Sequence, residues 1–290
     1  MKQRLNIILL LLLLTTTFRG QDDFGFSENE FLIYGGFGIS ALTYPVTIGE
    51  RKNGFGGHFG LGYLFAMGES GSLGFVLGAE AMMSKSTYTL DELKTQSRTS
   101  VFGELLDFHS EIENYEEVQN VVLVQVPLML QVQTASGLTD FYVGLGIKAG
   151  MPIVAKYKAS AATVMNTGTD PFSNNEPFDT QEFAGLGTFT NQSREGDVSF
   201  GFAVSAAAEA GLKIMLVSMT LYIGLSLDYG LLNIRPAATD TPFIEYNAES
   251  PREFKINSIT QSVYPQGSAS RAFTEKIVPL SFGLKIKVGF

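Results

Sequence analysis

Residues 279–290 read Pro279-Leu280-Ser281-Phe282-Gly283-Leu284-Lys285-Ile286-Lys287-Val288-Gly289-Phe290. From Leu280 onward every even position is large and apolar, and every odd position is small or charged. A period of two puts these two kinds of side chain on opposite faces of a β-strand. The pattern therefore predicts a strand with one apolar face and one polar face.

Seven further segments carry the same alternation, at about 31–41, 55–66, 72–84, 119–133, 140–157, 198–214 and 217–230. Most exceed the roughly 9–11 residues that a tilted transmembrane strand requires. With 277–290 they predict an all-β fold: an antiparallel up-and-down transmembrane barrel of eight strands. Strand-like runs in the connections, such as 254–259, leave ten strands as the alternative.

The connections alternate in length along the chain. Those at 67–71, 134–139 and 215–216 are short, whereas those at 42–54, 85–118, 158–197 and 231–276 are long. Transmembrane barrels have short periplasmic turns and longer extracellular loops. An even number of strands then places both termini in the periplasm. The turn at 215–216 lacks Gly, Pro, Asn and Asp, so its composition is unusual for a turn.

The first residues predict export. A positive start, Met1-Lys2-Gln3-Arg4, precedes an aliphatic run over 5–14 that is too short for a spanning helix. We interpret 1–20 as a signal peptide and 21–290 as the barrel domain. The sequence has no cysteine, which excludes disulfides and thiol chemistry, and a net charge of −9, which argues against nucleic-acid binding.

In each predicted strand, the positions that alternate with the large apolar ones are expected to point into the barrel. Among them are three acids and three lysines, and the candidate interior network comprises His58, Glu80, Gln125, Lys148, Glu209, Asp228, Lys285 and Lys287. Extrapolating from the short turns places His58 opposite Glu80 and Gln125 opposite Lys148. Because eight strands enclose only enough space for their own side chains, we expect these groups to fill the interior. The alternative is a salt-bridge gate in a narrow conduit.

Few residues suggest chemistry. His58 with Glu80 supplies two members of a Ser–His–acid arrangement, but no third residue is placed by the sequence. The acidic run 111–117 matches no calcium loop, so we expect a solvated face there and no metal or cofactor. Tyr44, Tyr88, Tyr157 and Tyr229 fall near the outer ends of the strands, where an interfacial aromatic belt is expected.

Several strands resemble those of the PorT-like outer-membrane β-barrels common in Bacteroidetes. The matching stretches are Val124-Gln125-Val126-Pro127-Leu128-Met129-Leu130, Phe141-Tyr142-Val143-Gly144-Leu145-Gly146 and Asp228-Tyr229-Gly230-Leu231. The resemblance implies eight strands and a bacterial outer-membrane location; the namesake of the family assists secretion. Phe290 likewise resembles the terminal aromatic that the barrel-assembly machinery reads.

These features predict a non-enzymatic barrel with a structural or surface-interaction role. Its partners would be outer-membrane lipid and lipopolysaccharide, the assembly machinery, and an unknown partner of the loops 85–118, 158–197 and 231–276. A narrow gated channel, a secretion-accessory barrel and a hydrolase centred on His58 are the alternatives.

Overall fold

A computed structural model describes residues 29–67, 72–101, 104–134, 139–170, 177–179, 184–235, 241–247, 249–250, 252–266 and 269–290. The predicted signal peptide lies outside these ranges. Within them no helix is long and apolar enough to cross a membrane.

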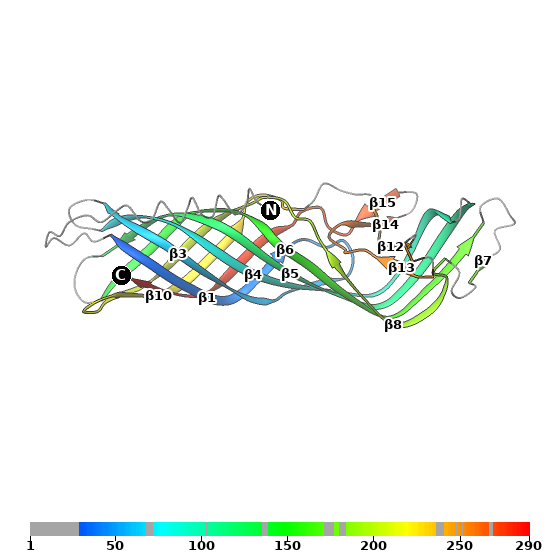
Figure 1. Ribbon diagram of the computed structural model, residues 1–290, viewed down its shortest axis with the longest axis horizontal. Coiled ribbons are helices and arrows are strands. Elements are labelled where there is room, and N and C mark those ends of the chain that lie inside the picture. The colour runs from blue at the N-terminus through cyan, green and yellow to red at the C-terminus, as the bar shows by residue number, and fades with distance from the viewer. Residues whose placement is uncertain are drawn as a thin grey trace.

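Eight antiparallel strands close into a barrel (Figure 1). In ring order they are β1 (Glu30–Thr43), β3 (Phe55–Met67), β4 (Leu73–Val101), β5 (Glu104–Gln133), β6 (Thr139–Thr169), β9 (Ala203–Met215), β10 (Thr220–Gly230) and β16 (Val278–Gly289). The ring closes where β16 pairs with β1 over Leu32 to Thr43. Beyond that ladder, Phe290 exchanges two backbone hydrogen bonds with Phe31, of 2.9 and 3.0 Å. The predicted fold class is confirmed, and the ten-stranded alternative is wrong.

The half of the barrel nearest the short turns is apolar outside and polar inside. Phe37, Phe59, Phe141 and Leu145 face outward and are well exposed, while the alternating residues point into the barrel. An apolar exterior around a charged interior is the arrangement of a barrel that crosses a bilayer. We call this part the belt half.

Three strands continue far beyond this belt. β4, β5 and β6 have 29, 30 and 31 residues, about three times what a bilayer requires. In Figure 1 they extend to the right of the barrel as a curved sheet, to which β8 (Gly187–Asp197) adds an edge strand. The predicted loops 85–118 and 158–197 are therefore largely β-structure. The alternation of their residues is interrupted near Asn114, which has a φ of 49°, so the continuous strand is hard to recognise from the sequence.

The long connection after β10 folds back onto this sheet. It contains β11 (Thr241–Pro242), β12 (Ile244–Tyr246), β13 (Phe254–Ile256), β14 (Ser262–Gln266) and β15 (Ala269–Ala272). β12 pairs with β13, and β14 pairs with β11 and β15, so the run 254–259 does not extend a barrel hairpin. We call residues 231–277 the cap. The remaining short strands are β2 (Glu50–Asn53), which pairs with β4, and β7 (Pro177–Phe178), which pairs with β6.

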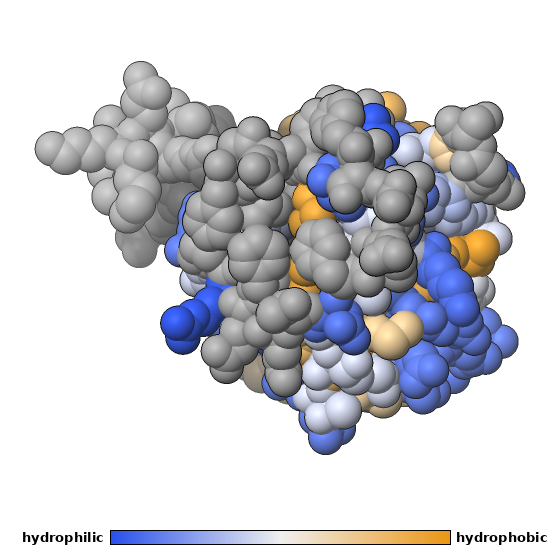
Figure 2. All heavy atoms as spheres, turned by 90° about the vertical axis from the view of Figure 1, so that its right-hand side faces the viewer, coloured by the Kyte–Doolittle hydropathy of each residue, from blue (hydrophilic) through white to orange (hydrophobic). Residues whose placement is uncertain are grey.

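The cap and the extended sheet share an apolar core. Phe243, Phe254 and Phe273 of the cap are buried together with Phe108 and Tyr115 of β5. Ring centroids lie 5.0 Å apart for Tyr115 and Phe243, and 4.9 Å apart for Phe243 and Phe273. The described residues at this end of the molecule are largely hydrophilic on the surface (Figure 2). This part, the outer half, is built like an ordinary water-soluble domain.

Three of the four tyrosines expected in an interfacial belt point inward instead. Tyr44 and Tyr88 are buried in the shared core, and the Tyr157 hydroxyl donates to the Ile256 carbonyl at 2.9 Å. Tyr88 has the same parity as Glu80 on one continuous strand, which places both inside. Only Tyr229 of this set faces outward, with 48% of its surface exposed.

The turn between β9 and β10 forms without favourable turn residues. Met215 pairs with Thr220, and the Leu216 N–H donates to the Met219 carbonyl at 2.9 Å. Val217 stands at the tip, fully exposed. Pairing along both strands evidently compensates for the poor local sequence.

Candidate functional site

The structure places all eight predicted network residues in the barrel interior. Each is less than a tenth exposed, although seven of the eight side chains carry an ionised group or an amide. Uncompensated charges are costly to bury, so their partners decide whether the interior is stable.

Lys148 is the centre of the first cluster. Its Nζ lies 2.9 Å from Glu80 Oε1 and 2.7 Å from Asp228 Oδ2. Gln125 donates from Nε2 to Glu80 Oε1 at 2.7 Å. The three charged residues come from β6, β4 and β10, and none of these strands is next to another in the ring. The cluster therefore spans the lumen.

The two strand pairings predicted from turn positions are wrong by two residues. Glu80 faces Gly60, and His58 faces Met82. Gln125 faces Gly150, and Lys148 faces Pro127. In each hairpin the turn is centred one residue later than expected. A shift of two keeps every side chain on its face, so the inward set is unaffected.

A second cluster lies around Glu209. Lys285 Nζ is 2.9 Å from Glu209 Oε2, and Lys287 forms an ion pair with the other oxygen, Oε1. Lys287 also donates to Gln131 Oε1 at 2.9 Å. One carboxylate thus accepts from two lysines of the same strand, and an amide receives the second bond of Lys287.

Aromatic rings cover these lysines. Lys285 Nζ lies 4.3 Å from the ring centroid of Tyr34, and Lys287 Nζ lies 4.3 Å from that of Tyr142 and 4.8 Å from that of Tyr222. An ammonium group over a ring face is attracted by its quadrupole. The parity of Tyr142 and Tyr222 placed them inside, but their contacts with lysine could not be predicted from parity alone.

A third cluster, at the end of the short turns, was missed. Glu30 accepts from the Tyr222 hydroxyl at 2.8 Å and pairs with Lys213 at 3.2 Å. The alternation predicts a first strand that begins at 31, after Glu30, and it places Lys213 at the end of the segment 198–214, next to the turn. The only available signal was that both residues share the inward parity of their strands.

His58 stands apart from these clusters. It is buried, and its Nε2 atom has no hydrogen-bond partner among the described residues. The ring occupies the space above Gly36, where an added Cβ would lie 2.4 Å from His58 Cε1. This arrangement fills space and does not resemble a Ser–His–acid site, in which the imidazole is held by hydrogen bonds.

Glu117 of the outer half was expected in a solvated acidic face, but it is fully buried. Its carboxylate accepts from the Tyr115 hydroxyl at 2.6 Å, Gln119 Nε2 at 2.8 Å, Ser258 Oγ at 2.6 Å and the Ile259 N–H at 3.0 Å. Burial raises the pKa of Glu117 despite these donors. Two of the four donors belong to the cap, so Glu117 fastens the cap to β5.

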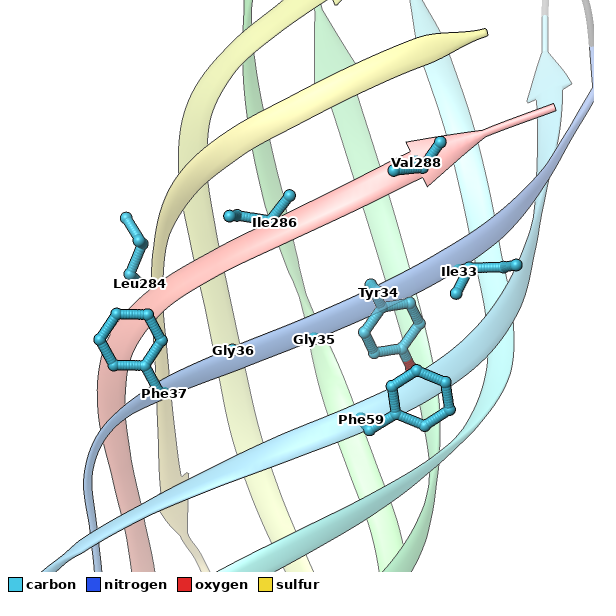
Figure 3. A pocket seen from close by; sticks show the side chains of 9 residues that line it. All are labelled: Ile33, Tyr34, Gly35, Gly36, Phe37, Phe59, Leu284, Ile286 and Val288. Atoms are coloured by element: carbon cyan, nitrogen blue, oxygen red, sulfur yellow. The ribbon is translucent and has the colours of Figure 1, made fainter.

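The described residues contain no group of three or more histidines and acids that could hold a metal ion. The outer wall has an apolar depression of about 400 Å³, where Gly35 and Gly36 leave space between Ile33, Phe37 and Ile286 (Figure 3). Apart from Tyr34, the residues that line it are apolar or glycine.

Comparisons with known proteins identify no family for this chain. No family model and no curated protein matches the chain. Among solved structures, it is similar to the outer membrane protein OprG from Pseudomonas aeruginosa, with 12% identity and a TM-score of 0.34 over 93% of this chain and 99% of that one. The description of the barrel therefore rests on the strand pairing of this chain.

Proposed function

We propose that this protein is a bacterial outer-membrane β-barrel with a closed lumen, which displays its outer half for interaction at the cell surface. The observation that carries the proposal is the double closure of the barrel. The clusters around Lys148 and Glu209 fill the belt half, and the cap with its apolar core covers the mouth.

The orientation follows from the two ends of the barrel. The end with short turns would face the periplasm, together with both termini, and the extended sheet and cap would face outward. Lipid and lipopolysaccharide would surround the belt half. Phe290, at the end of the closing strand, would be recognised by the barrel-assembly machinery. Membership of the PorT-like family, and with it a secretion-accessory role, stays a prediction.

The closed lumen favours a non-enzymatic scaffold over a gated channel. A gate requires a second arrangement of the lumen in which the charged side chains separate. Separation would cost free energy, because each charge would lose a partner that now lies at hydrogen-bond distance in a narrow interior. The cap, which shares a buried apolar core with the extended sheet, would block the same path for ions a second time. Both closures would have to open together for ions to pass.

Planar-bilayer conductance of the refolded mature protein tests this proposal, after a heat-modifiability gel has shown that the barrel is folded. We expect a silent bilayer. Discrete openings whose current changes in Lys148→Ala would overturn the closed-barrel proposal and establish the channel. Openings that appear only after the cap is deleted would show that the cap, and not the charged network, is the closure.

A further inference from the structure

The extended sheet has an open edge that the proposed function leaves unexplained. β2 pairs with β4 only from Ser86 to Thr89. Beyond Thr89, β4 continues to Val101 with β5 on one side, and no strand of the described residues pairs with its other side. Every second residue of an antiparallel edge strand points both its N–H and its C=O away from its neighbour. This edge therefore presents a row of alternating donors and acceptors.

A groove runs beside this edge. It has a volume of about 200 Å³ and is lined on one side by Thr95, Gln96, Ser97 and Arg98 of β4. The opposite wall consists of cap residues, namely Pro242, Phe243, Val263, Tyr264, Pro265 and Ser270. A chain added to β4 would thus lie against the β14–β15 hairpin as well as against the strand edge.

The groove contains an unsatisfied polar group. Ser97 is nine-tenths buried, and its hydroxyl has no hydrogen-bond partner among the described residues. Buried hydroxyls are usually hydrogen-bonded, so one without a partner in a groove indicates a position where a ligand supplies the missing partner.

The charge on the adjacent face favours a basic ligand. Two outward rungs of the β4–β5 ladder, with the Gln96–His109 rung between them, pair Arg98 with Asp107 and Lys94 with Glu111 as ion pairs. Lys94 Nζ also lies 3.6 Å from Glu92 Oε1, so this one ammonium group serves two carboxylates. The next rung places Glu92 opposite Glu113, so that two carboxylates face each other directly. Like charges in opposed positions destabilise a sheet. A cationic side chain on an added strand would reduce this repulsion.

We propose that the edge of β4 from Asp91 to Arg98 binds an extended, basic polypeptide segment of a partner protein by strand addition. The backbone of the segment completes the ladder, its inward side chains enter the groove beside Ser97, and its outward lysine or arginine side chains approach Glu92 and Glu113. Polypeptide is the ligand class that presents alternating N–H and C=O groups at the spacing of a strand. This inference rests on the proposed function, because it requires the outer half to face a partner.

A defined peptide tests the proposal. The full mature protein in detergent micelles is titrated with a fluorescent peptide of about eight residues in which lysine and valine alternate, a length typical of strands. Two control peptides carry a central proline or have glutamate in place of lysine. We expect the lysine–valine peptide to bind, and each control to bind at least about tenfold more weakly, because proline removes a ladder donor and glutamate adds repulsion.

Matched protein variants locate the site. Glu92→Lys on the edge strand β4 should weaken binding about fivefold or more, whereas Glu195→Lys on β8, the opposite edge of the same sheet, should not change it. Ser97→Leu, which fills the groove, should abolish binding, and a heat-modifiability gel confirms that each variant is folded. Amide hydrogen exchange should slow in β4 between Asp91 and Arg98 when the peptide is bound.

Three results would overturn the proposal: no binding of the lysine–valine peptide, equal binding of the proline peptide, or protection that appears away from β4. Conductance is recorded on the same preparation. A silent barrel that binds no peptide refutes only the strand addition, whereas a conducting barrel refutes the proposed function whatever the peptide does.

Discussion

Three strands, β4, β5 and β6, run through both halves of this molecule, and their apolar side chains face outward in the belt half and inward in the outer half. In the belt half of β6, Leu145 faces outward and Lys148 lies inside. In the outer half of the same strand, Lys158 is exposed and Ala159 is buried. The strand continues without a break between these residues. The comparison shows that the surrounding solvent, and not the strand geometry, decides which side chains a β-sheet conceals.

A β-bulge lies where the polarity changes. The β5–β6 register shifts between Val122 and Leu123, which pair with Val154 and Pro152, so β6 has one extra residue there. Inward positions of β6 are even-numbered before the bulge, as at Tyr142, and odd-numbered directly after it, as at Ala159 and Ala161. A bulge re-aims side chains in this way. It allows one strand to serve two environments with different sequence patterns.

The largest expected effect is in the belt half, at the charged interior. Lys148→Met removes the shared partner of Glu80 and Asp228 and leaves both carboxylates buried. We expect the free energy of unfolding to fall by about 3–5 kcal/mol, measured by urea titration of the protein in lipid vesicles. A loss below about 1 kcal/mol would show that the interior is hydrated and does not depend on this ion pair.

The same type of substitution should act differently in the two halves. Phe243→Ala creates a cavity between Tyr115 and Phe273 in the outer core, and we expect a loss of about 3 kcal/mol. Phe37→Ala removes a ring from the outer wall, which lipid chains would contact instead, so its effect should be much smaller. Limited proteolysis of the cap and heat-modifiability of the barrel measure the two effects separately. Equal losses would contradict the division into halves.

A smaller effect concerns the pH dependence of the cap. The folded-state pKa of Glu117 is raised, so its contribution to stability is fully present below the unfolded value, about 4.3, and is lost as the pH rises through the folded value. We expect the cap to become less stable over this range, as followed by near-ultraviolet circular dichroism of its tyrosines during urea unfolding. In Glu117→Gln this part of the pH dependence should be absent. An unchanged pH profile would show that other groups cause it.

The smallest effect is expected on the exposed face of the outer half. Lys94→Ala removes ion pairs with Glu111 and Glu92 that lie in solvent. Because exposed pairs contribute little, the urea midpoint should stay at its wild-type value. A clear shift of the urea midpoint would show that this face is less hydrated than its exposure indicates. The stability effects of the Lys94 and Lys148 substitutions would then differ less than the account predicts.

The residues that point into the barrel could be predicted, because the alternation of apolar and polar positions can be recognised within each strand alone. Glu80, Lys148 and Asp228 were assigned to the interior from the alternation of their neighbours alone. Their mutual contacts could not be predicted, because they lie on β4, β6 and β10 and meet across the lumen. Such contacts depend on the closure and stagger of the whole barrel.

The outer half was harder to predict, for a related reason. Its strands change inward parity at Asn114, and a window that spans the change shows no period of two. Glu117 therefore looked like one member of an acidic run, although it is buried between β5 and the cap. The sequence contains no local signal for the Ser258 and Ile259 donors that satisfy it, since they lie more than a hundred residues away.

Tryptophan scanning with quenchers tests the division into two halves most directly, because the chain has no tryptophan of its own. Two outward positions of β6 are compared in vesicles, Leu145→Trp in the belt half and Ser160→Trp in the outer half. The account predicts that brominated lipid quenches the first and leaves the second, and that aqueous iodide does the reverse. Quenching of both positions by brominated lipid, or of neither, would contradict it.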